Sequence, residues 1–273
     1  MNSKIYMCGD LHGDYYPVKT FYEYMNFIGQ PLTENNILIV LGDFGANYYL
    51  GLRDSIFKKH LNDYKMTYFI IRGNHEERPS ICMKNNPGQW HIEDFWGGQV
   101  YVENEFPYIK YALDVPSKYE IPTAQGKPIK TLVLPGAYSV DKDYRLANHW
   151  SWFPQEQCNE EEMLWGKMLA ATADWDLILS HTCPVIYEPT DLFLPMIDQS
   201  KVDKTTEIWL GDIEYKTNYK LWCWGHYHAN RIYPRVENKD KLMLFNDYFL
   251  DVYKYFCGNY DLYNSLIKIR IDI

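Results

Sequence analysis

The order of apolar and amphipathic segments in this 273-residue chain predicts an α/β fold. Short apolar runs of strand length alternate with amphipathic segments of helix length, as expected where helices pack on a largely parallel sheet. Polar clusters follow the carboxyl ends of several apolar runs, which is the edge where open α/β sheets bind ligands. No repeat, linker or low-complexity tract interrupts the pattern, so we expect a single domain over residues 1–273.

The first part of the chain shows this alternation most clearly. The run from Ile37 to Leu41 is apolar throughout, which is typical of a strand buried on both faces. Residues 77–98 show no regular pattern, and residues 99–112 predict two short strands around Pro107. We expect strands over residues 4–8, 37–41 and 67–71, and helices over residues 18–28 and 49–61.

The second part of the chain is expected to contain more strands. Proline and glycine residues between Pro116 and Pro128 predict a loop or a hairpin. Asn159 is a favourable N-cap, and three glutamates follow it in the first turn, so a helix is expected to run from there to about Thr172. Further strands are expected over residues 131–134, 176–179, 221–224, 231–233, 241–245 and 266–271.

The charge balance of the chain narrows its possible partners. It has 27 Lys and Arg residues against 36 Asp and Glu residues, a net charge of −9, and no long basic run. A protein that binds duplex nucleic acid usually carries a basic stripe, so we expect no such partner. A small phosphorylated substrate remains compatible with this charge, because bound divalent cations would reverse the local field.

The cysteines and the N-terminus indicate a cytoplasmic protein. The six cysteines form no CxxC pair, and several lie in apolar runs, so they are expected to be buried free thiols. Residues from Lys4 onward already predict a strand rather than a signal peptide. No stretch is long and apolar enough to cross a bilayer, so no membrane partner is expected.

Five polar clusters follow expected strands, and together they predict a metal site. They supply carboxylates, imidazoles and an amide oxygen, which suit a borderline divalent metal. Glycines beside them permit tight turns and a close approach of the backbone. The clusters are Gly9-Asp10-Leu11-His12-Gly13-Asp14, Gly42-Asp43, Gly73-Asn74-His75-Glu76, Ser180-His181 and Gly225-His226-Tyr227-His228.

The motifs GDLHGD, GDFG, GNHE, SH and GHYH, in this order, resemble those of the calcineurin-like metallophosphoesterase superfamily. The resemblance implies a four-layer αββα sandwich of two mixed β-sheets flanked by helices. It also implies two divalent metal ions, most readily Mn, with Fe, Zn, Co or Ni as alternatives. By this resemblance, Asp10, His12 and His228 hold one ion, Asn74, His181 and His226 hold the other, and Asp43 bridges them.

The implied reaction is the hydrolysis of a phosphate monoester or diester. Two such ions share a hydroxide that attacks phosphorus in line with the leaving oxygen. His75 is the candidate general acid, with a structural role beside the ligands as the alternative. Arg145, at the end of the string GAYSVDKDYR, either binds the substrate phosphate or pairs with Asp141 or Asp143.

The residues from Arg72 to Glu76 also resemble the serine/threonine phosphoprotein phosphatases, which makes Arg72 a second candidate for binding substrate. Those enzymes have an Asp and an Arg shortly after the bridging Asp, where this chain has Ala46 and Asn47. This difference removes an Arg that would bind the substrate phosphate and an Asp that would pair with the catalytic histidine. The chain therefore looks more similar to bacterial and phage-type metallophosphatases, in which strings like GAYSVDKDYR also occur.

Two other functions fit the motifs less well. A nuclease acting on short single strands is disfavoured by the acidic charge balance. A catalytically inactive metal-binding scaffold would be expected to have lost ligands, yet all seven ligand positions are present. The expected substrate is a phosphorylated small molecule, a nucleotide or a phosphoprotein, and the motifs do not distinguish these because surrounding loops set specificity.

Overall fold

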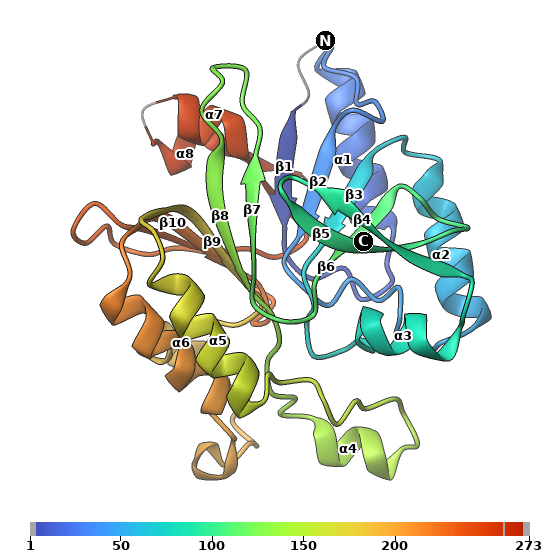
Figure 1. The fold of residues 1–273 in the computed structure, drawn as a ribbon, viewed down its shortest axis with the longest axis vertical. Coiled ribbons are helices and arrows are strands. Elements are labelled where there is room, and N and C mark those ends of the chain that lie inside the picture. The colour runs from blue at the N-terminus through green and yellow to red at the C-terminus, as the bar shows by residue number, and fades with distance from the viewer. Residues whose placement is uncertain (1–3, 259, 270–273) are drawn as a thin grey trace.

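Two β-sheets pack face to face in the computed structural model, which describes residues 4–258 and 260–269 (Figure 1). The larger sheet contains β1 (Ile5–Cys8), β2 (Ile37–Val40), β3 (Thr67–Ile70), β4 (Trp90–Phe95), β5 (Gly98–Glu103), β6 (Ile109–Ala112), β13 (Tyr248–Asp251) and β14 (Leu266–Lys268). Over the described residues the strand order is β14-β13-β1-β2-β3-β6-β5-β4. The central strands β1, β2, β3 and β6 are parallel, so their carboxyl ends lie at one edge.

The smaller sheet also has a parallel centre. It contains β7 (Ser117–Ile121), β8 (Ile129–Leu134), β9 (Trp175–Ser180), β10 (Tyr219–Trp224), β11 (Arg231–Ile232) and β12 (Asp240–Met243). The order within the described part of the chain is β11-β12-β10-β9-β8-β7, with β8, β9, β10 and β12 parallel. Strands β7 and β8 are antiparallel neighbours and form the hairpin that was one of the two predictions for this region.

Alternation along the strands divides the apolar residues between layers. In β1, Ile5 and Met7 lie in the core between the two sheets, which also contains Leu177 of the smaller sheet. The intervening Tyr6 and Cys8 face the other way and pack under the helices that cover the larger sheet. Both faces of the central strands are therefore buried, which explains why these strands are continuously apolar in sequence.

Helices cover the two outer faces and complete four layers, as Figure 1 shows. The larger sheet is covered by α1 (Tyr16–Phe27), α2 (Leu52–Asn62) and α3 (Pro79–Asn85), and the smaller one by α5 (Glu160–Ala170) and α6 (Thr205–Lys216). Shorter helices are α4 (Lys142–Ala147), α7 (Val252–Cys257) and α8 (Leu262–Ser265), with 3-10 turns η1 (Val185–Tyr187), η2 (Thr190–Leu192) and η3 (Gln199–Lys201). The predicted arrangement of two mixed sheets flanked by helices is confirmed.

Two regions differ from the sequence-based prediction. The irregular stretch over residues 77–98 contains α3 and β4, and the strand-rich C-terminal third also contains α6, α7 and α8. Helix α6 was missed because it buries Glu207 and Glu214 beside Trp209, which hides the apolar period of the helix. Of the strand expected over residues 266–271, β14 covers Leu266–Lys268, and residues 270 and 271 lie outside the described part.

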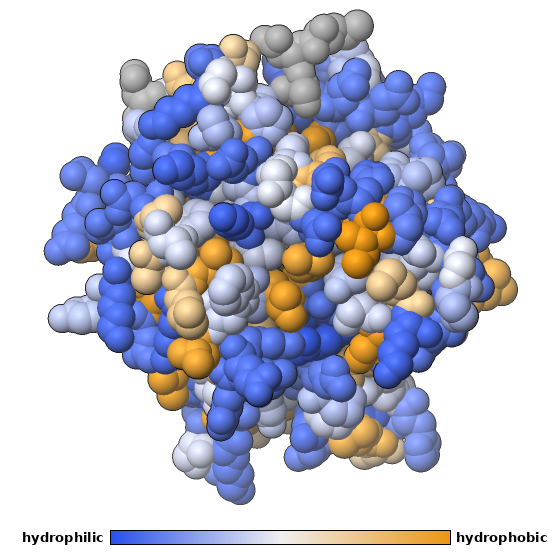
Figure 2. Space-filling model, in the orientation of Figure 1, coloured by the Kyte–Doolittle hydropathy of each residue, from blue (hydrophilic) through white to orange (hydrophobic). Residues whose placement is uncertain are grey.

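Most of the molecular face shown in Figure 2 is hydrophilic, with hydrophobic residues in small groups. Five of the six free cysteines are buried as predicted, whereas Cys257 is exposed. Within residues 4–258 and 260–269, no helix combines the length and the apolar character that a membrane span requires. The cytoplasmic location stays a prediction.

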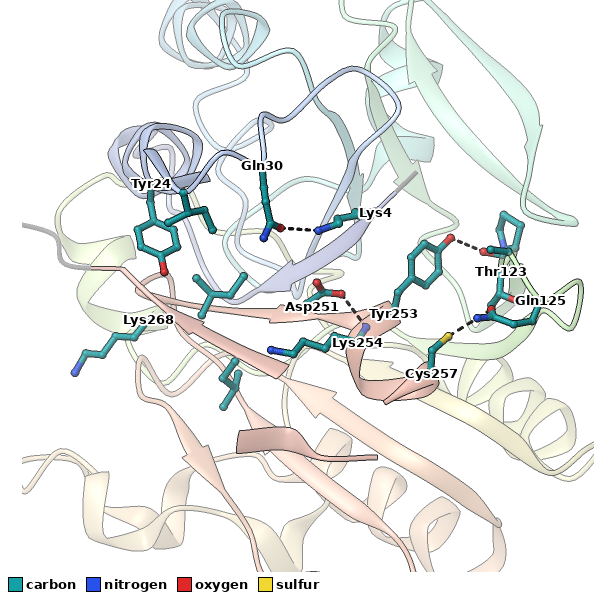
Figure 3. A pocket seen from close by; sticks show the side chains of 15 residues that line it. Lys4, Tyr24, Gln30, Thr123, Gln125, Asp251, Tyr253, Lys254, Cys257 and Lys268 are labelled. Atoms are coloured by element: carbon teal, nitrogen blue, oxygen red, sulfur yellow. Dashed lines mark hydrogen bonds between the residues drawn. The ribbon is translucent and has the colours of Figure 1, made fainter. Parts of the chain in front are cut away.

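A groove of about 890 Å³ lies near the amino end of β1 (Figure 3). At this groove Lys4 donates to the Gln30 side chain at 2.6 Å, and the Tyr253 hydroxyl donates to the Pro122 carbonyl oxygen. Lys4 precedes β1, whereas the polar cluster at Asp10 follows it. The groove is therefore at the opposite end of the strand from that cluster.

The sequence-predicted N-cap of α5 supports a test of stability. Asn159 Oδ1 accepts from the Glu162 amide, and Glu162 Oε2 accepts from the Asn159 amide, both at 2.9 Å, which is a capping box. Asn159→Ala is expected to lower the free energy of unfolding by about 1 kcal/mol, measured by urea denaturation. Glu161→Ala, an exposed change in the same turn, is the control, and equal losses in the two variants would contradict the capping role.

Candidate metal centre

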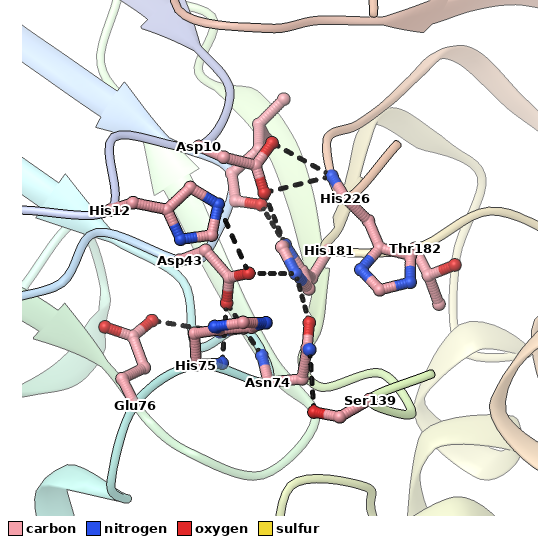
Figure 4. Close-up of polar contacts among 12 residues, drawn as sticks. Asp10, His12, Asp43, Asn74, His75, Glu76, Ser139, His181, Thr182 and His226 are labelled. Atoms are coloured by element: carbon pink, nitrogen blue, oxygen red, sulfur yellow. Dashed lines mark hydrogen bonds and ion pairs between the residues drawn. The ribbon is translucent and has the colours of Figure 1, made fainter. Parts of the chain in front are cut away.

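The polar clusters predicted from the sequence meet where strands of both sheets end. Asp10 follows β1, Asp43 follows β2 and Asn74 follows β3, whereas His181 and His226 follow β9 and β10 of the other sheet. Figure 4 shows these side chains pointing toward one another. The carboxyl edges of two parallel sheet centres thus form a single polar site.

One group of potential ligands consists of Asp10, His12 and His228. One ligand atom from each of the three lies within 4.8 Å of the others. The Nε2 atoms of His12 and His228 are 2.9 Å apart, although they come from opposite ends of the chain. This is the first triad that the resemblance assigned to a metal ion.

A second group consists of Asp43, His181 and His226, again with ligand atoms within 4.8 Å of one another. Asn74 joins this group, because its Oδ1 is 2.8 Å from His181 Nε2. Asp43 Oδ2 lies 3.4 Å from His181 Nε2 and 3.9 Å from His12 Nε2. Asp43 is therefore the carboxylate between the two groups, in the position expected of a bridging ligand.

Backbone amides hold both buried carboxylates in place. Asp43 Oδ1 accepts from the amides of Asn74 at 2.9 Å and His75 at 2.8 Å, which leaves Oδ2 facing the imidazoles. Asp10 accepts from the His226 amide at 3.0 and 3.1 Å, a contact that joins the larger sheet to the smaller one. These amides fix each carboxylate oxygen without supplying a full positive charge.

The orientation of His181 leaves one ring nitrogen facing the site. Its Nδ1 donates to the Leu41 carbonyl oxygen at 2.6 Å, so Nε2 points toward Asn74 and Asp43. Burial lowers the pKa of His181, but the Asp43 and Asp10 carboxylates outweigh it and raise the pKa to about 9. A divalent cation would have to replace the proton on this imidazole, which makes metal affinity dependent on pH.

Four of the proposed ligands have backbones in the left-handed region. The φ angles are 50° for His12, 47° for Asp43, 71° for His226 and 50° for His228. Such a conformation costs a residue other than glycine about 1–3 kcal/mol, and it persists only where surrounding structure enforces it. Concentration of this strain in the polar clusters supports a functional role for them.

Glycines allow the ligand loops to approach one another closely. A Cβ atom on Gly73 would lie 2.1 Å from Asp43 Oδ1, and one on Gly42 would lie 2.2 Å from His181 Nδ1. Gly42 also has a φ of +92°, which side chains rarely allow. The glycines seen beside the motifs in the sequence are thus needed for the packing of the ligands.

His75, the predicted general acid, lies at the edge of the two groups. Its side chain is 24% exposed, and its Nε2 is 3.9 Å from Asp141 Oδ1. Burial, opposed by Asp43, lowers the pKa of His75. His75 also forms a potential ligand group with His12 and Asp43, so the fold brings it within reach of both a metal ion and a substrate.

Asp141 is the residue of this site that sequence reasoning missed. It was considered only as a partner for Arg145, whose Nη1 is 3.6 Å away, yet it also faces His75. Its segment is held to the ligands through Ser139, whose Oγ accepts from Asn74 Nδ2 at 2.9 Å and from Arg145 Nη1 at 3.0 Å. The sequence signal that could have identified Asp141 is the position of the string GAYSVDKDYR, which directly follows an expected strand.

Arg72, the other predicted substrate-binding residue, directs its guanidinium to backbone carbonyl oxygens. Its side chain is buried, and its guanidinium donates to the carbonyl oxygens of Gln155, Glu156 and Asp114. These contacts brace the segment before α5. A role of Arg72 in binding substrate stays a prediction.

A family model described as calcineurin-like phosphoesterase matches residues 3–230. The chain belongs to this family. Phosphoester hydrolysis with the help of metal ions is the chemistry of the calcineurin-like phosphoesterases, and the described residues offer the ligand groups that such chemistry requires. No curated protein sequence matches the chain.

Solved structures similar to this family member include TT1561 of Thermus thermophilus, at 12% identity and a TM-score of 0.52, covering 99% of this chain and 100% of that one. GAP50 of Plasmodium, described as the anchor in the inner membrane complex, has 13% identity, a TM-score of 0.49, and coverage of 89% and 71%. The 5′-nucleotidase of Candida albicans SC5314 has 14% identity, a TM-score of 0.44, and coverage of 98% and 50%. At 12% identity, the likeness to TT1561 concerns the fold alone.

The close approach of Gly73 to Asp43 gives a test of this centre. In Gly73→Ala the added Cβ would collide with Asp43 Oδ1, so the variant is expected to bind fewer equivalents of Mn, measured by calorimetric titration. Gly51→Ala is the matched control, because a Cβ there meets its nearest atom at 3.8 Å. Retention of full Mn binding by Gly73→Ala would contradict the proposed arrangement.

Proposed function

We propose that this calcineurin-like phosphoesterase hydrolyses phosphate monoesters or diesters with two bound divalent metal ions. The observation that supports this most strongly is the position of Asp43 between two groups of ligand atoms. When bound, such ions supply a hydroxide for in-line attack on phosphorus and offset the charge that develops on the phosphoryl oxygens. Mn is the preferred metal of the proposal, with Fe, Zn, Co and Ni as alternatives, because the donors are imidazoles and oxygens.

The ligand roles follow the geometry of the two groups. Asp43 contributes to both, and its fixed Oδ1 keeps Oδ2 between the imidazoles. Oxygen and imidazole donors in this number match the coordination preferences of borderline divalent metals. One ion would be held by Asp10, His12 and His228, and the other by Asn74, His181 and His226.

His75 is proposed to donate a proton to the leaving oxygen of the substrate. Its partial exposure allows it to reach a substrate, and Asp43 holds its backbone through the amide contact at 2.8 Å. The Asp141 carboxylate faces Nε2 and favours the protonated ring, so Asp141 acts as a positioning residue. Together they supply the acid that the departure of an alkoxide or phenoxide requires.

Arg145 contributes positive charge behind this pair. The 3.6 Å distance to Asp141 favours the pairing that the sequence left open, and the guanidinium is fully buried. Its Nη2 has no hydrogen-bond partner among the described residues. Because this atom is also buried, we propose that Arg145 reaches an oxygen of the substrate phosphate only when the segment that carries Asp141 moves aside.

An assay with metal removal and replacement tests the proposed function. We expect the Mn-loaded protein to hydrolyse p-nitrophenyl phosphate or its bis ester, a chelator to abolish turnover, and added Mn to restore it. The same panel should include cyclic nucleotides, dinucleoside polyphosphates, a phosphopeptide and single-stranded DNA. Absence of turnover on every substrate, with metals demonstrably bound, would instead support the inactive scaffold.

The proposed acid predicts a dependence on the leaving group. His75→Ala should retain Mn binding and lose about 10²–10⁴-fold in kcat with an alkyl phosphate, but less with p-nitrophenyl phosphate, whose leaving group needs little protonation. His91→Ala, a change in the exposed His91, is the control. Asp141→Asn should add little to the loss in His75→Ala, because the two act as one unit. Unchanged turnover of the alkyl phosphate in His75→Ala would refute this role.

A further inference from the structure

A cavity of about 300 Å³ adjoins the proposed metal centre. Asp43, Asn74 and His226 are among the residues that line it. Eight further lining residues fall within residues 188–203, which connect η1 to α6 and belong to none of the motifs. The volume is at the lower end of the range found for small-molecule sites.

Several of the lining residues from the end of η2 toward α6 are apolar. Leu192, Phe193, Leu194 and Ile197 all line the cavity. Leu192 and Leu194 are also exposed, at 41% and 60%, so the folded chain leaves apolar surface open beside a charged centre. A ligand that covers this apolar surface removes it from water, which favours binding of the ligand.

The connecting segment is anchored at several points. Glu188 pairs with Lys204 at 2.6 Å, and Asp191 pairs with Arg231 at 2.6 Å. The Phe193 ring stacks on Tyr227, with centroids 6.4 Å apart, in the loop that carries two of the proposed ligands. These contacts hold the apolar wall against the metal centre.

The charges around the cavity are acidic. Glu188, Asp203, Glu207 and Asp141 line it, and none of the described lining residues is a lysine or an arginine. Lys204, close by, is occupied by Glu188. Metal ions would attract a single phosphoryl group, but a second phosphate placed in the cavity would meet carboxylates, and the nearby cations Lys204 and Arg145 already pair with Glu188 and Asp141.

We propose that this cavity binds the organic group of the substrate, and that this group is an apolar aryl or alkyl group without a further phosphate. The inference rests on the proposed phosphoesterase function and narrows its substrate class. Apolar contact with the wall selects the organic group, and the acidic lining rejects polyphosphates and nucleic acid strands. Leu192, Phe193, Leu194 and Ile197 thus determine specificity, and they take no part in the bond-breaking step.

Two changes to aspartate on the same segment test the proposal. Leu194 lines the cavity, whereas Met196 is 94% exposed and is not among the lining residues. With Mn, Leu194→Asp is expected to lower kcat/KM for 4-methylumbelliferyl phosphate about tenfold, because an apolar contact of this size discriminates by that order. The loss should appear in KM, and turnover of acetyl phosphate, which lacks a large apolar group, should be unchanged. Met196→Asp should leave both substrates unaffected.

Binding of the product alcohol separates this inference from the proposed function. Fluorescence titration with 4-methylumbelliferone should show binding to the Mn-loaded protein and to Met196→Asp, and weaker binding to Leu194→Asp. If no phosphate compound is hydrolysed, the proposed function fails, and the titration alone decides whether the cavity takes an apolar group. Equal loss with both substrates in Leu194→Asp, or equal binding of 4-methylumbelliferone in all three proteins, would overturn the inference.

Discussion

Burial of the Asp43 carboxylate between the two sheets is the constraint on which the centre depends. Only 1% of this residue is exposed, and an isolated carboxylate in such a place would be strongly disfavoured. Two backbone amides stabilise one oxygen, and His181 faces the other at 3.4 Å. Because burial is opposed first by His181 and then by His75, the pKa of Asp43 is held well below its usual range. The charged form, which a metal ion requires, is thus the one the fold favours.

The sandwich also enforces a strained backbone around that charge. His12, Asp43, His226 and His228 all have positive φ, and the ends of β1 and β10 are tied by the amide of His226 on Asp10. Burial of the apolar layers supplies the free energy that maintains this strain, because the core between the sheets contains residues from strands of both sheets. A loosely packed pair of sheets would let these turns relax, and the ligand atoms would separate.

The parts of the structure that could be predicted from the sequence are those determined by the local pattern of apolar and polar residues. Apolar runs define strands, and each run ends at a polar cluster, so the edge carrying Asp43 and His181 followed from sequence order alone. Contacts between segments that are distant in the sequence could not be predicted in this way. Asp141 faces His75 only because of how its loop packs, and Arg72, although two residues from Asn74, directs its guanidinium to the Glu156 carbonyl. Residues 71–76 lie beyond the end of β3 and are not a regular strand, so a spacing of two residues does not imply a shared site.

The absence of an Asp and an Arg at Ala46 and Asn47 has a structural counterpart elsewhere in the chain. In the segment after β8, Asp141 faces His75 and Arg145 pairs with Asp141. Their loop also lines the cavity, through Tyr138, Val140 and Asp141, together with residues from the segment 188–203. One segment therefore contacts both the proposed acid, His75, and the cavity proposed for the organic group of the substrate. A change of substrate in such a site would involve these two loops together, while the metal ligands at the strand ends remained in place.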